Sequence, residues 1–296
     1  MKTLRTFAGP DDLSIDSEVM THRQKSSIGN DLIKTYMQHY YRMPRNFDDF
    51  VYLGLLLQGH GIAYGIETNR RQRPVCMGSL YWQLNDSWPA ISWSAIDYYK
   101  NKKALYYHAR DAFAPLMLST FVHGDSLEIH ALSDRLDRLD RAQIVVGIDD
   151  FHGNRLNTVT LERTIRPNAS QKMATLALAD LLKGHPASEV LLTWQIHHDG
   201  KVLARGHKFL VLPKELKLPR PHLTKAIETT PQGIALTLST DCLAKDVFIE
   251  IPTQEADLSD NFFDLMPGER KVVTIESADI TPDDIAHIRI RTLTDT

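Results

Sequence analysis

The sequence has few cysteines, no surplus of basic residues and no long apolar run, and each absence excludes a class of protein. Cys76 and Cys242 are its only cysteines, too few and too widely spaced for a disulfide framework or a cysteine-ligated zinc site. The formal net charge is −3, whereas nucleic-acid binders usually carry a basic face. No run of about 18 apolar residues occurs. We therefore expect two free, buried thiols, no nucleic-acid partner and no membrane-spanning helix.

The composition is that of a folded protein with several domains. The chain has 296 residues, of which 43% are hydrophobic and 24% charged, which allows two or three cores of ordinary size. The first seven residues lack the apolar core of a signal peptide. In a fragment this absence assigns no compartment, so the localisation is left open.

Before Pro115, the spacing of apolar residues predicts mainly helices. Asn46 is a candidate N-cap for a long helix, because Asp48 and Asp49 follow it in the first turn. A nearly continuous apolar run follows that helix and indicates a buried strand. The order is then helix, strand, aromatic loop and helix, as in a βα unit. The predicted elements are helices over residues 31–41, 46–71 and 102–113, a strand over residues 76–84 and a loop over residues 85–99.

After Pro115, short alternating runs and turn residues predict antiparallel β-structure. Asp199-Gly200 is a type I′ hairpin signal between two such runs. Residues 213–221 are rich in proline and lysine and are typical of a linker. The predicted strands are residues 116–122, 126–132, 190–197, 202–212, 233–239, 246–251, 271–276 and 287–292, with a turn at 265–269. Residues 134–141 alternate in charge and predict a solvated loop or short helix.

The most informative stretch is residues 81–89, Tyr-Trp-Gln-Leu-Asn-Asp-Ser-Trp-Pro, which continues to residue 99. It resembles the last barrel strand and following loop of β-mannosidases of glycoside hydrolase family 2. Matching segments occur along nearly the whole chain. They are residues 103–107 and 113–115, Gln58, Gly61, Tyr64, Ile66 and Glu67 on the long helix, and residues 260–265 with 267–269.

The resemblance implies a multidomain fold with an α/β part and an all-β part. Residues 1–113 would be the C-terminal fragment of a TIM (β/α)8 barrel, comprising its last helices and final strand. An immunoglobulin-like β-sandwich would span residues 114–213, and a second would span residues 222–296 after a linker at 214–221. Since so little of the barrel is present, we expect residues 1–112 to be the least stable region or to oligomerise.

The resemblance also implies a sugar-binding role for three residues. Trp82 would be the platform under the sugar at the cleavage site, because a flat indole can cover the C–H face of a pyranose. Asn85 and Asp86 would be polar groups beside it. The alternatives are core packing for Trp82 and a role in holding the loop for Asn85 and Asp86. Trp88 and Trp93 are interpreted as structural covers over the strand end.

Neither catalytic carboxylate of a retaining glycosidase is recognisable in this chain. The family places its acid/base in an Asn-Glu pair and its nucleophile in a Ser-Glu-(Phe/Tyr)-Gly segment, and neither pattern occurs here. Residues 17–20, Ser-Glu-Val-Met, mimic the second only in part, and Glu67 is expected to pair with Arg70 or Arg71.

The resemblance implies that both catalytic glutamates, the acid/base and the nucleophile, lie upstream of Met1. The chain would then begin just after the nucleophile and be inactive alone. Its partners would be the missing N-terminal part of the enzyme and an oligosaccharide with terminal β-mannose.

The function predicted from the sequence is therefore the C-terminal portion of a retaining exo-β-mannosidase, with no cofactor and no metal. His197 and His198 alternate along a strand and should face opposite sides, and Gly59-His60-Gly61 lies in a helix rather than in a dinucleotide-binding turn. Two alternatives remain open. One is a non-catalytic carbohydrate-binding or scaffolding module, and the other is a different family 2 glycosidase such as a β-galactosidase.

Overall fold

The computed structural model describes residues 2–231, 233–251, 256–277 and 280–296. Met1 lies outside the described residues. The resemblance places both catalytic carboxylates upstream of it, and that expectation stays a prediction. The chain divides into two compact units. The first contains the residues up to Ala63, Leu80–Arg110 and Arg220–Thr296, and the second contains Tyr64–Ser79 and Asp111–Pro219. Of the helices in these described ranges, none combines the length and the apolar character needed to cross a membrane.

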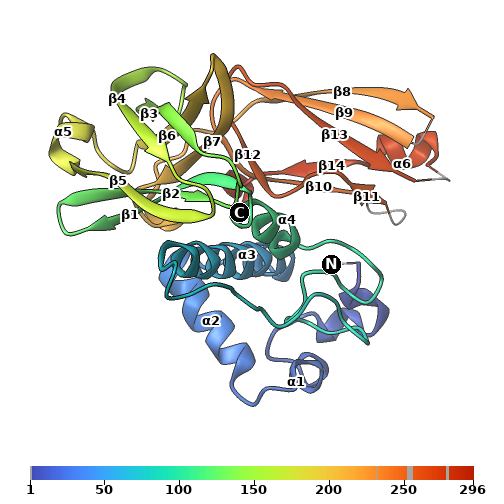
Figure 1. The fold of residues 1–296 in the computed structure, drawn as a ribbon. Coiled ribbons are helices and arrows are strands. Elements are labelled where there is room, and N and C mark those ends of the chain that lie inside the picture. The colour runs from blue at the N-terminus through green and yellow to red at the C-terminus, as the bar shows by residue number, and fades with distance from the viewer. Residues whose placement is uncertain (1, 232, 252–255, 278–279) are drawn as a thin grey trace. The chain divides into compact units, whose positions relative to one another are not determined.

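The first part of the chain is helical (Figure 1). Its helices are α1 (Glu18–Gln24), α2 (Gly29–Tyr40), α3 (Phe47–Arg71) and α4 (Ala104–Ala112), with 3-10 turns at Leu4–Thr6 and Pro10–Asp12. The Asn46 side chain accepts a hydrogen bond from the Asp49 backbone N–H at 2.8 Å, so the predicted N-cap of the long helix is confirmed. The predicted helices before and after it are also confirmed to within two residues.

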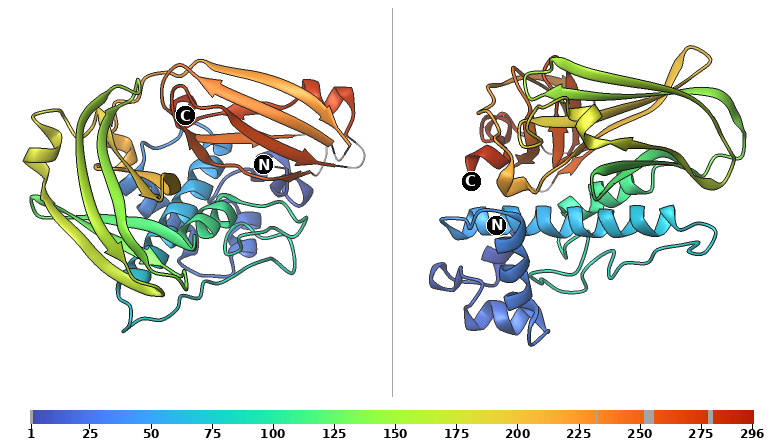
Figure 2. Two further views of the ribbon diagram at one scale, coloured as in Figure 1. Left: turned by 45° about the horizontal axis from the view of Figure 1, so that its top comes forward. Right: turned by 90° about the vertical axis from the view of Figure 1, so that its left-hand side faces the viewer.

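The predicted strand over residues 76–84 is wrong, because that segment is an irregular stretch (Figure 2). An apolar run becomes a strand only if a neighbour satisfies its N–H and C=O groups. Within the described residues, no β-ladder includes this segment. Its last residues pair instead with the loop that follows: the Ile96 N–H donates to the Leu84 C=O at 2.8 Å, and the Ala95 N–H donates to the Gln83 C=O at 2.9 Å. No closed barrel is formed by the described chain.

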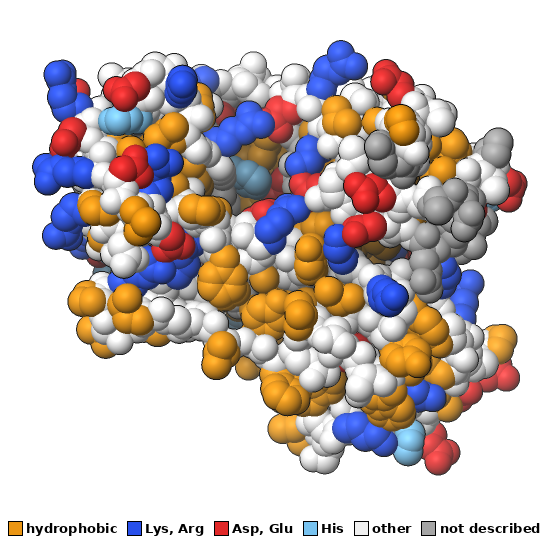
Figure 3. Space-filling model, turned by 45° about the vertical axis from the view of Figure 1, so that its right-hand side comes forward, with side chains coloured by type: hydrophobic (Ala, Val, Ile, Leu, Met, Phe, Trp, Pro, Cys, Tyr) orange, Lys and Arg blue, Asp and Glu red, His pale blue; other side chains and the backbone are white. Residues whose placement is uncertain are grey.

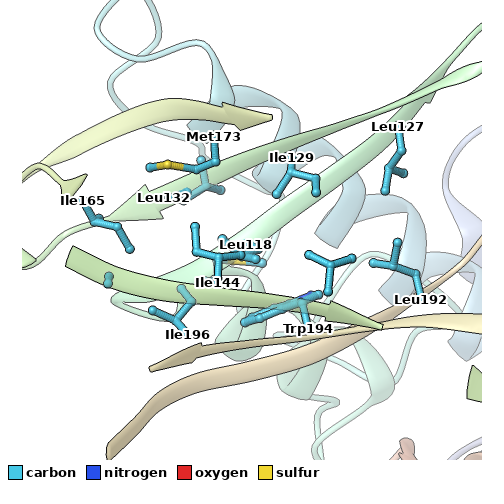
Figure 4. Packing of buried hydrophobic residues seen from close by; sticks show 14 of the residues in the cluster. Leu118, Leu127, Ile129, Leu132, Ile144, Ile165, Met173, Leu192, Trp194 and Ile196 are labelled. Atoms are coloured by element: carbon cyan, nitrogen blue, oxygen red, sulfur yellow. The ribbon is translucent and has the colours of Figure 1, made fainter. Parts of the chain in front are cut away.

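The second unit contains an antiparallel sandwich. One sheet has the order β1-β2-β5, and the other has the order β4-β3-β6-β7. Their inner faces meet in one hydrophobic core, in which Leu118, Ile129 and Met173 face Ile144 and Trp194 (Figure 4). The bounds are β1 Leu116–His123, β2 Ser126–Ser133, β3 Leu139–Asp150, β4 Arg155–Ile165, β5 Ala169–Ala177, β6 Val190–His198 and β7 Lys201–Phe209, with α5 at Leu178–Leu182 and a 3-10 turn at Pro213–Glu215.

Of two local predictions in this sandwich, the hairpin turn is confirmed and the charged loop is confirmed only in part. Asp199 and Gly200 have φ values of 50° and 73°, as the type I′ hairpin between β6 and β7 requires. The charged stretch 134–141 is a loop only up to residue 138, because β3 begins at Leu139. Leu139 is buried and brings the end of this stretch into the sheet, so that prediction is wrong for its last residues.

The C-terminal sandwich belongs to the first unit. Its sheets have the orders β11-β13-β9-β8 and β12-β10-β14, and the fully buried Leu236, Val247 and Val273 lie in its core. Its elements are β8 Leu223–Thr230, β9 Gly233–Thr240, β10 Ala244–Glu250, β11 Asp257–Leu258, β12 Phe263–Leu265, β13 Lys271–Glu276, α6 Pro282–Ala286, β14 Arg289–Arg291 and a 3-10 turn at Leu293–Asp295. The predicted turn at 265–269 contains Gly268 with φ 78°.

The last turns of α3 belong to the second unit and are held there by a buried guanidinium. Arg70 donates to the Ala112 C=O at 2.6 Å, to the Ala114 C=O at 2.9 Å and to the Asp134 carboxylate at 2.9 Å.

The predicted ion pair of Glu67 on the same helix is confirmed. Its carboxylate lies 4.0 Å from Arg71 and accepts a hydrogen bond from Ser119 at 2.8 Å.

The two cysteines are free thiols, as predicted. Cys242 is buried but Cys76 is only half-buried. The expectation of two buried thiols is therefore wrong for Cys76.

Candidate functional site

The candidate site is the stretch around Trp82. The side chains of Leu80, Trp82 and Leu84 are 103%, 76% and 56% exposed, whereas the intervening Tyr81 and Gln83 are half-buried. This alternation is the pattern of a strand with one face against protein. Hydrophobic side chains are also exposed elsewhere over the helical part of the chain, in the lower half of Figure 3. Trp82 is not packed in a core of the described residues, and both interpretations of it, as sugar platform and as core residue of a completed barrel, stay predictions.

Asn85 and Asp86 differ in their surroundings. The Asp86 carboxylate is buried and accepts a hydrogen bond from the Ser94 hydroxyl at 2.6 Å and a longer one from the Gln83 amide at 3.4 Å. Asn85 is exposed, and its amide donates to the Asp86 C=O at 3.4 Å. Asp86 therefore holds the loop, whereas Asn85 and Trp82 present their side chains to solvent.

Helix α1 also contacts this loop. The indole N–H of Trp93 donates to the Gln24 C=O at 3.0 Å, and the Ser92 hydroxyl donates to the Gln24 side chain at 3.1 Å. The guanidinium of Arg23 lies 4.6 Å from the centre of the Trp88 ring and donates to the Pro89 C=O at 2.9 Å. Both tryptophans thus contact α1, whereas their interpretation as covers over a strand end stays a prediction, because residues 76–84 form no strand here.

A lysine ammonium is desolvated beside the loop. Lys103 donates to the Ser92 C=O at 3.2 Å. Burial lowers the pKa of Lys103 to about 8, and the nearby carboxylates of Asp86 and Asp97 offset this only in part. Folding therefore disfavours the charged lysine, so the free energy of unfolding should rise as the pH increases from the folded pKa of about 8 towards the unfolded value of 10.5.

Replacing this lysine by an uncharged residue tests that account. We expect Lys103→Met to stabilise the fold at about pH 7.5, and its advantage over wild type to shrink by about 2 kcal/mol by about pH 10. Urea denaturation across this pH range measures the difference. Lys225→Met, at an exposed position on β8, is the matched control and should show a constant difference. A pH-independent effect of Lys103→Met would contradict the assignment.

The carboxylates weighed as a nucleophile have structural roles. Glu18 is the first residue of α1, where a negative side chain interacts favourably with the positive end of the helix dipole. Glu67 is engaged by Arg71 and Ser119 as described above. The expectation that neither glutamate is the nucleophile stays a prediction.

A second group of side chains, His60, His108 and Asp246, was not predicted from sequence motifs. Its members are far apart in the sequence, and only the packing of α3, α4 and β10 brings them together.

Comparison with known proteins identifies both sandwiches. A family model described as a mannosidase Ig/CBM-like domain matches residues 125–215, and a mannosidase Ig-fold domain matches residues 218–296. The β-mannosidase of Capra hircus is 28% identical over 92% of this chain, and that of Bos taurus is 29% identical over 92%. The chain spans 33% of the length of each of these relatives.

Solved structures support the same fold. The β-D-mannosidase of Dictyoglomus thermophilum superposes with a TM-score of 0.84 at 22% identity, over 98% of this chain and 35% of that one. The exo-chitosanase of Amycolatopsis orientalis gives a TM-score of 0.75 at 16% identity, over 99% of this chain and 40% of that one. The two mannosidase-type Ig domains, together with curated relatives that align along nearly the whole chain, match this chain to the C-terminal part of β-mannosidases of glycoside hydrolase family 2.

Proposed function

We propose that this chain is the C-terminal portion of a retaining exo-β-mannosidase that releases terminal β-D-mannose from oligosaccharides. Its part before the first sandwich would complete a (β/α)8 barrel with polypeptide outside these 296 residues. That polypeptide, upstream of Met1, would carry both catalytic carboxylates, so the chain alone would be inactive. The domain limits that we propose are residues 1–113, 114–213 and 222–296, with a linker at 214–221.

The observation that carries this proposal is the exposed alternation of Leu80, Trp82 and Leu84. Burying a leucine side chain is worth about 2 kcal/mol, so a row of exposed apolar side chains is unfavourable in water. Neighbouring barrel strands would pair with the free N–H and C=O groups at the edges of this segment, and the remainder of the barrel would cover the leucine side chains. The aromatic loop that follows would then lie at the C-terminal end of the strand, where α/β barrels place their active sites.

In such an enzyme the residues of this chain would position the sugar. A retaining glycosidase uses an acid/base to protonate the leaving oxygen and a nucleophile to form a glycosyl-enzyme, which water then hydrolyses. The Trp82 ring would lie under the pyranose and exclude water, and the Asn85 amide would reach its hydroxyl groups. Asp86 would act indirectly, because its bond to Ser94 fixes the loop that carries both residues.

The experiment joins this chain to the remainder of a relative. The part of the Dictyoglomus thermophilum enzyme that precedes the region superposed here supplies the missing barrel. We expect the fused protein to hydrolyse an aryl β-mannoside and the separate chain to show no turnover. Hydrolysis by the separate chain, or an inactive fusion that is folded by circular dichroism, would contradict the proposal.

Two controls separate the alternatives. Aryl β-galactoside and β-glucosaminide should be hydrolysed more slowly than the β-mannoside by the fusion, and the reverse order would indicate another family 2 activity. Calorimetric titration of the separate chain with β-mannosides should show no binding, because one wall of a pocket cannot enclose the sugar. Tight binding by the separate chain would favour a carbohydrate-binding module.

A further inference from the structure

Two histidines and an aspartate meet inside the first unit. One potential ligand atom of each of His60, His108 and Asp246 lies within 4.8 Å of those of the other two. His60 is on α3, His108 on α4 and Asp246 on β10. The two imidazole rings are 4.4 Å apart between centres, and the His60 Nε2 lies 3.0 Å from the Asp246 Oδ1.

The hydrogen bonds of His108 leave one of its ring nitrogens with a lone pair. Its Nε2 lies 2.9 Å from the Phe262 C=O, and because a carbonyl can only accept, this nitrogen must carry the hydrogen. In the neutral ring the Nδ1 then carries the lone pair, and it is buried without a hydrogen-bond partner in the described part of the chain. A histidine whose other nitrogen donates to a backbone carbonyl is the arrangement that metal-ligating histidines show.

The residue opposite this nitrogen on α3 is a glycine. A Cβ at position 59 would lie 2.8 Å from the His108 Nδ1, so a side chain there would press against the nitrogen. The glycine therefore leaves space beside it.

Asp246 supplies a buried negative charge in a fixed orientation. Its side chain is 1% exposed, and its Oδ2 lies 3.0 Å from the Lys245 ammonium, which leaves Oδ1 on the side of His60. The same ammonium lies 3.6 Å from Asp264. Two carboxylates and one ammonium carry a formal charge of −1 together, which favours a cation at this position.

We propose that His60, His108 and Asp246 form a binding site for a zinc-like divalent cation that ties α3 and α4 to the C-terminal sandwich. Two imidazoles and one carboxylate suit Zn²⁺, with a fourth position left for water. Ligand distances of about 2.0–2.2 Å require the three groups to move closer by about an ångström. The His60 side chain is 41% exposed and so has the freedom to move.

Titration of the chain with Zn²⁺ after chelator treatment tests the site. We expect one equivalent to bind and to raise the free energy of unfolding, since the ion binds only the folded state. His60→Ala should weaken binding by about 100-fold or more. The matched control is His39→Ala, at an exposed position on α2, which should bind as wild type does. The absence of binding by wild type, or equal binding by His60→Ala, would overturn the proposal.

Cobalt provides a second readout that needs no variant. Co²⁺ in a four-coordinate site of low symmetry absorbs visible light more strongly than the hexa-aquo ion. We expect wild type to develop this absorption with one equivalent of Co²⁺ and to lose it on addition of Zn²⁺. A spectrum identical to that of free Co²⁺ would show that the three side chains form only a hydrogen-bonded cluster.

Discussion

Replacing Trp82 by alanine in the completed enzyme is expected to lower kcat/KM for aryl β-mannosides by about 100-fold. The estimate follows from the apolar area that an indole covers, because full burial of a large side chain contributes about 1.5–3 kcal/mol. A sugar that no longer rests on this ring would also be held less firmly against the catalytic groups. Steady-state kinetics of the fusion and its variant measure the effect.

The same substitution should scarcely change the stability of the separate chain. Trp82 is 76% exposed there, so its removal should alter the free energy of unfolding by less than about 0.5 kcal/mol. Tyr98→Ala is a matched control, because Tyr98 is an exposed aromatic of the same loop, and it should retain most of the activity. If Trp82→Ala left kcat/KM unchanged, the ring would not be the sugar platform.

Asp246→Asn is expected to destabilise the first unit by about 3 kcal/mol or more, because it leaves the buried Lys245 without its nearer carboxylate. Both side chains are almost fully buried, at 1% and 3% exposure. Asparagine keeps the shape of aspartate and tolerates the φ of 55° at this position. Urea denaturation in the presence of a chelator measures the effect of the ion pair apart from that of any bound metal.

Asp137→Asn is the matched control for that measurement. Asp137 pairs with Arg135 at 2.7 Å, but its side chain is 58% exposed. Pairs of this kind contribute about 0–1 kcal/mol, so the variant should unfold close to wild type. An effect of Asp246→Asn as small as that of Asp137→Asn would show that Lys245 gains a replacement partner or water.

The parts of the fold that were predictable are those determined by neighbouring residues. Asn46 and the two aspartates after it specify where α3 begins, and the Asp199-Gly200 pair specifies the hairpin between β6 and β7. Their geometry depends on local capping and turn conformations, so a reader of the sequence needs no knowledge of distant segments. Of the sandwich strands in the described residues, β1, β2, β6, β7, β9, β10, β13 and β14 were predicted from their alternation, whereas β3, β4, β5, β8, β11 and β12 were not.

The strand predicted over residues 76–84 was wrong because a strand forms only when a neighbouring strand pairs with its backbone N–H and C=O groups. Its apolar pattern is that of a strand buried on both faces, but the described chain offers no neighbour to which Leu80 or Trp82 could be paired. Asp86 illustrates a second limit. Its proximity to Ser94 depends on how the loop turns back, which the residue types alone do not determine.

The cluster of His60, His108 and Asp246 was not predictable from spacing. Metal motifs are recognisable when ligands share a helix or a turn, whereas these three come from two helices and a strand. Gly59 lies close to His108, but at Gly61 and Gly65 of the same helix no described atom lies within 4 Å of the position that a Cβ would take. The glycines of α3 therefore do not by themselves show where α4 approaches.

Hydrogen exchange of the backbone amides of residues 80–84 tests the central claim most directly. If this segment is a barrel strand that lacks its neighbours, its amides other than that of Gln83, which donates to the Trp93 C=O at 3.3 Å, should exchange rapidly in the separate chain. They should become protected in the fusion with the remainder of the relative. The sandwich strands should be protected in both proteins. Protection of residues 80–84 in the separate monomer, or rapid exchange in an active fusion, would contradict the account.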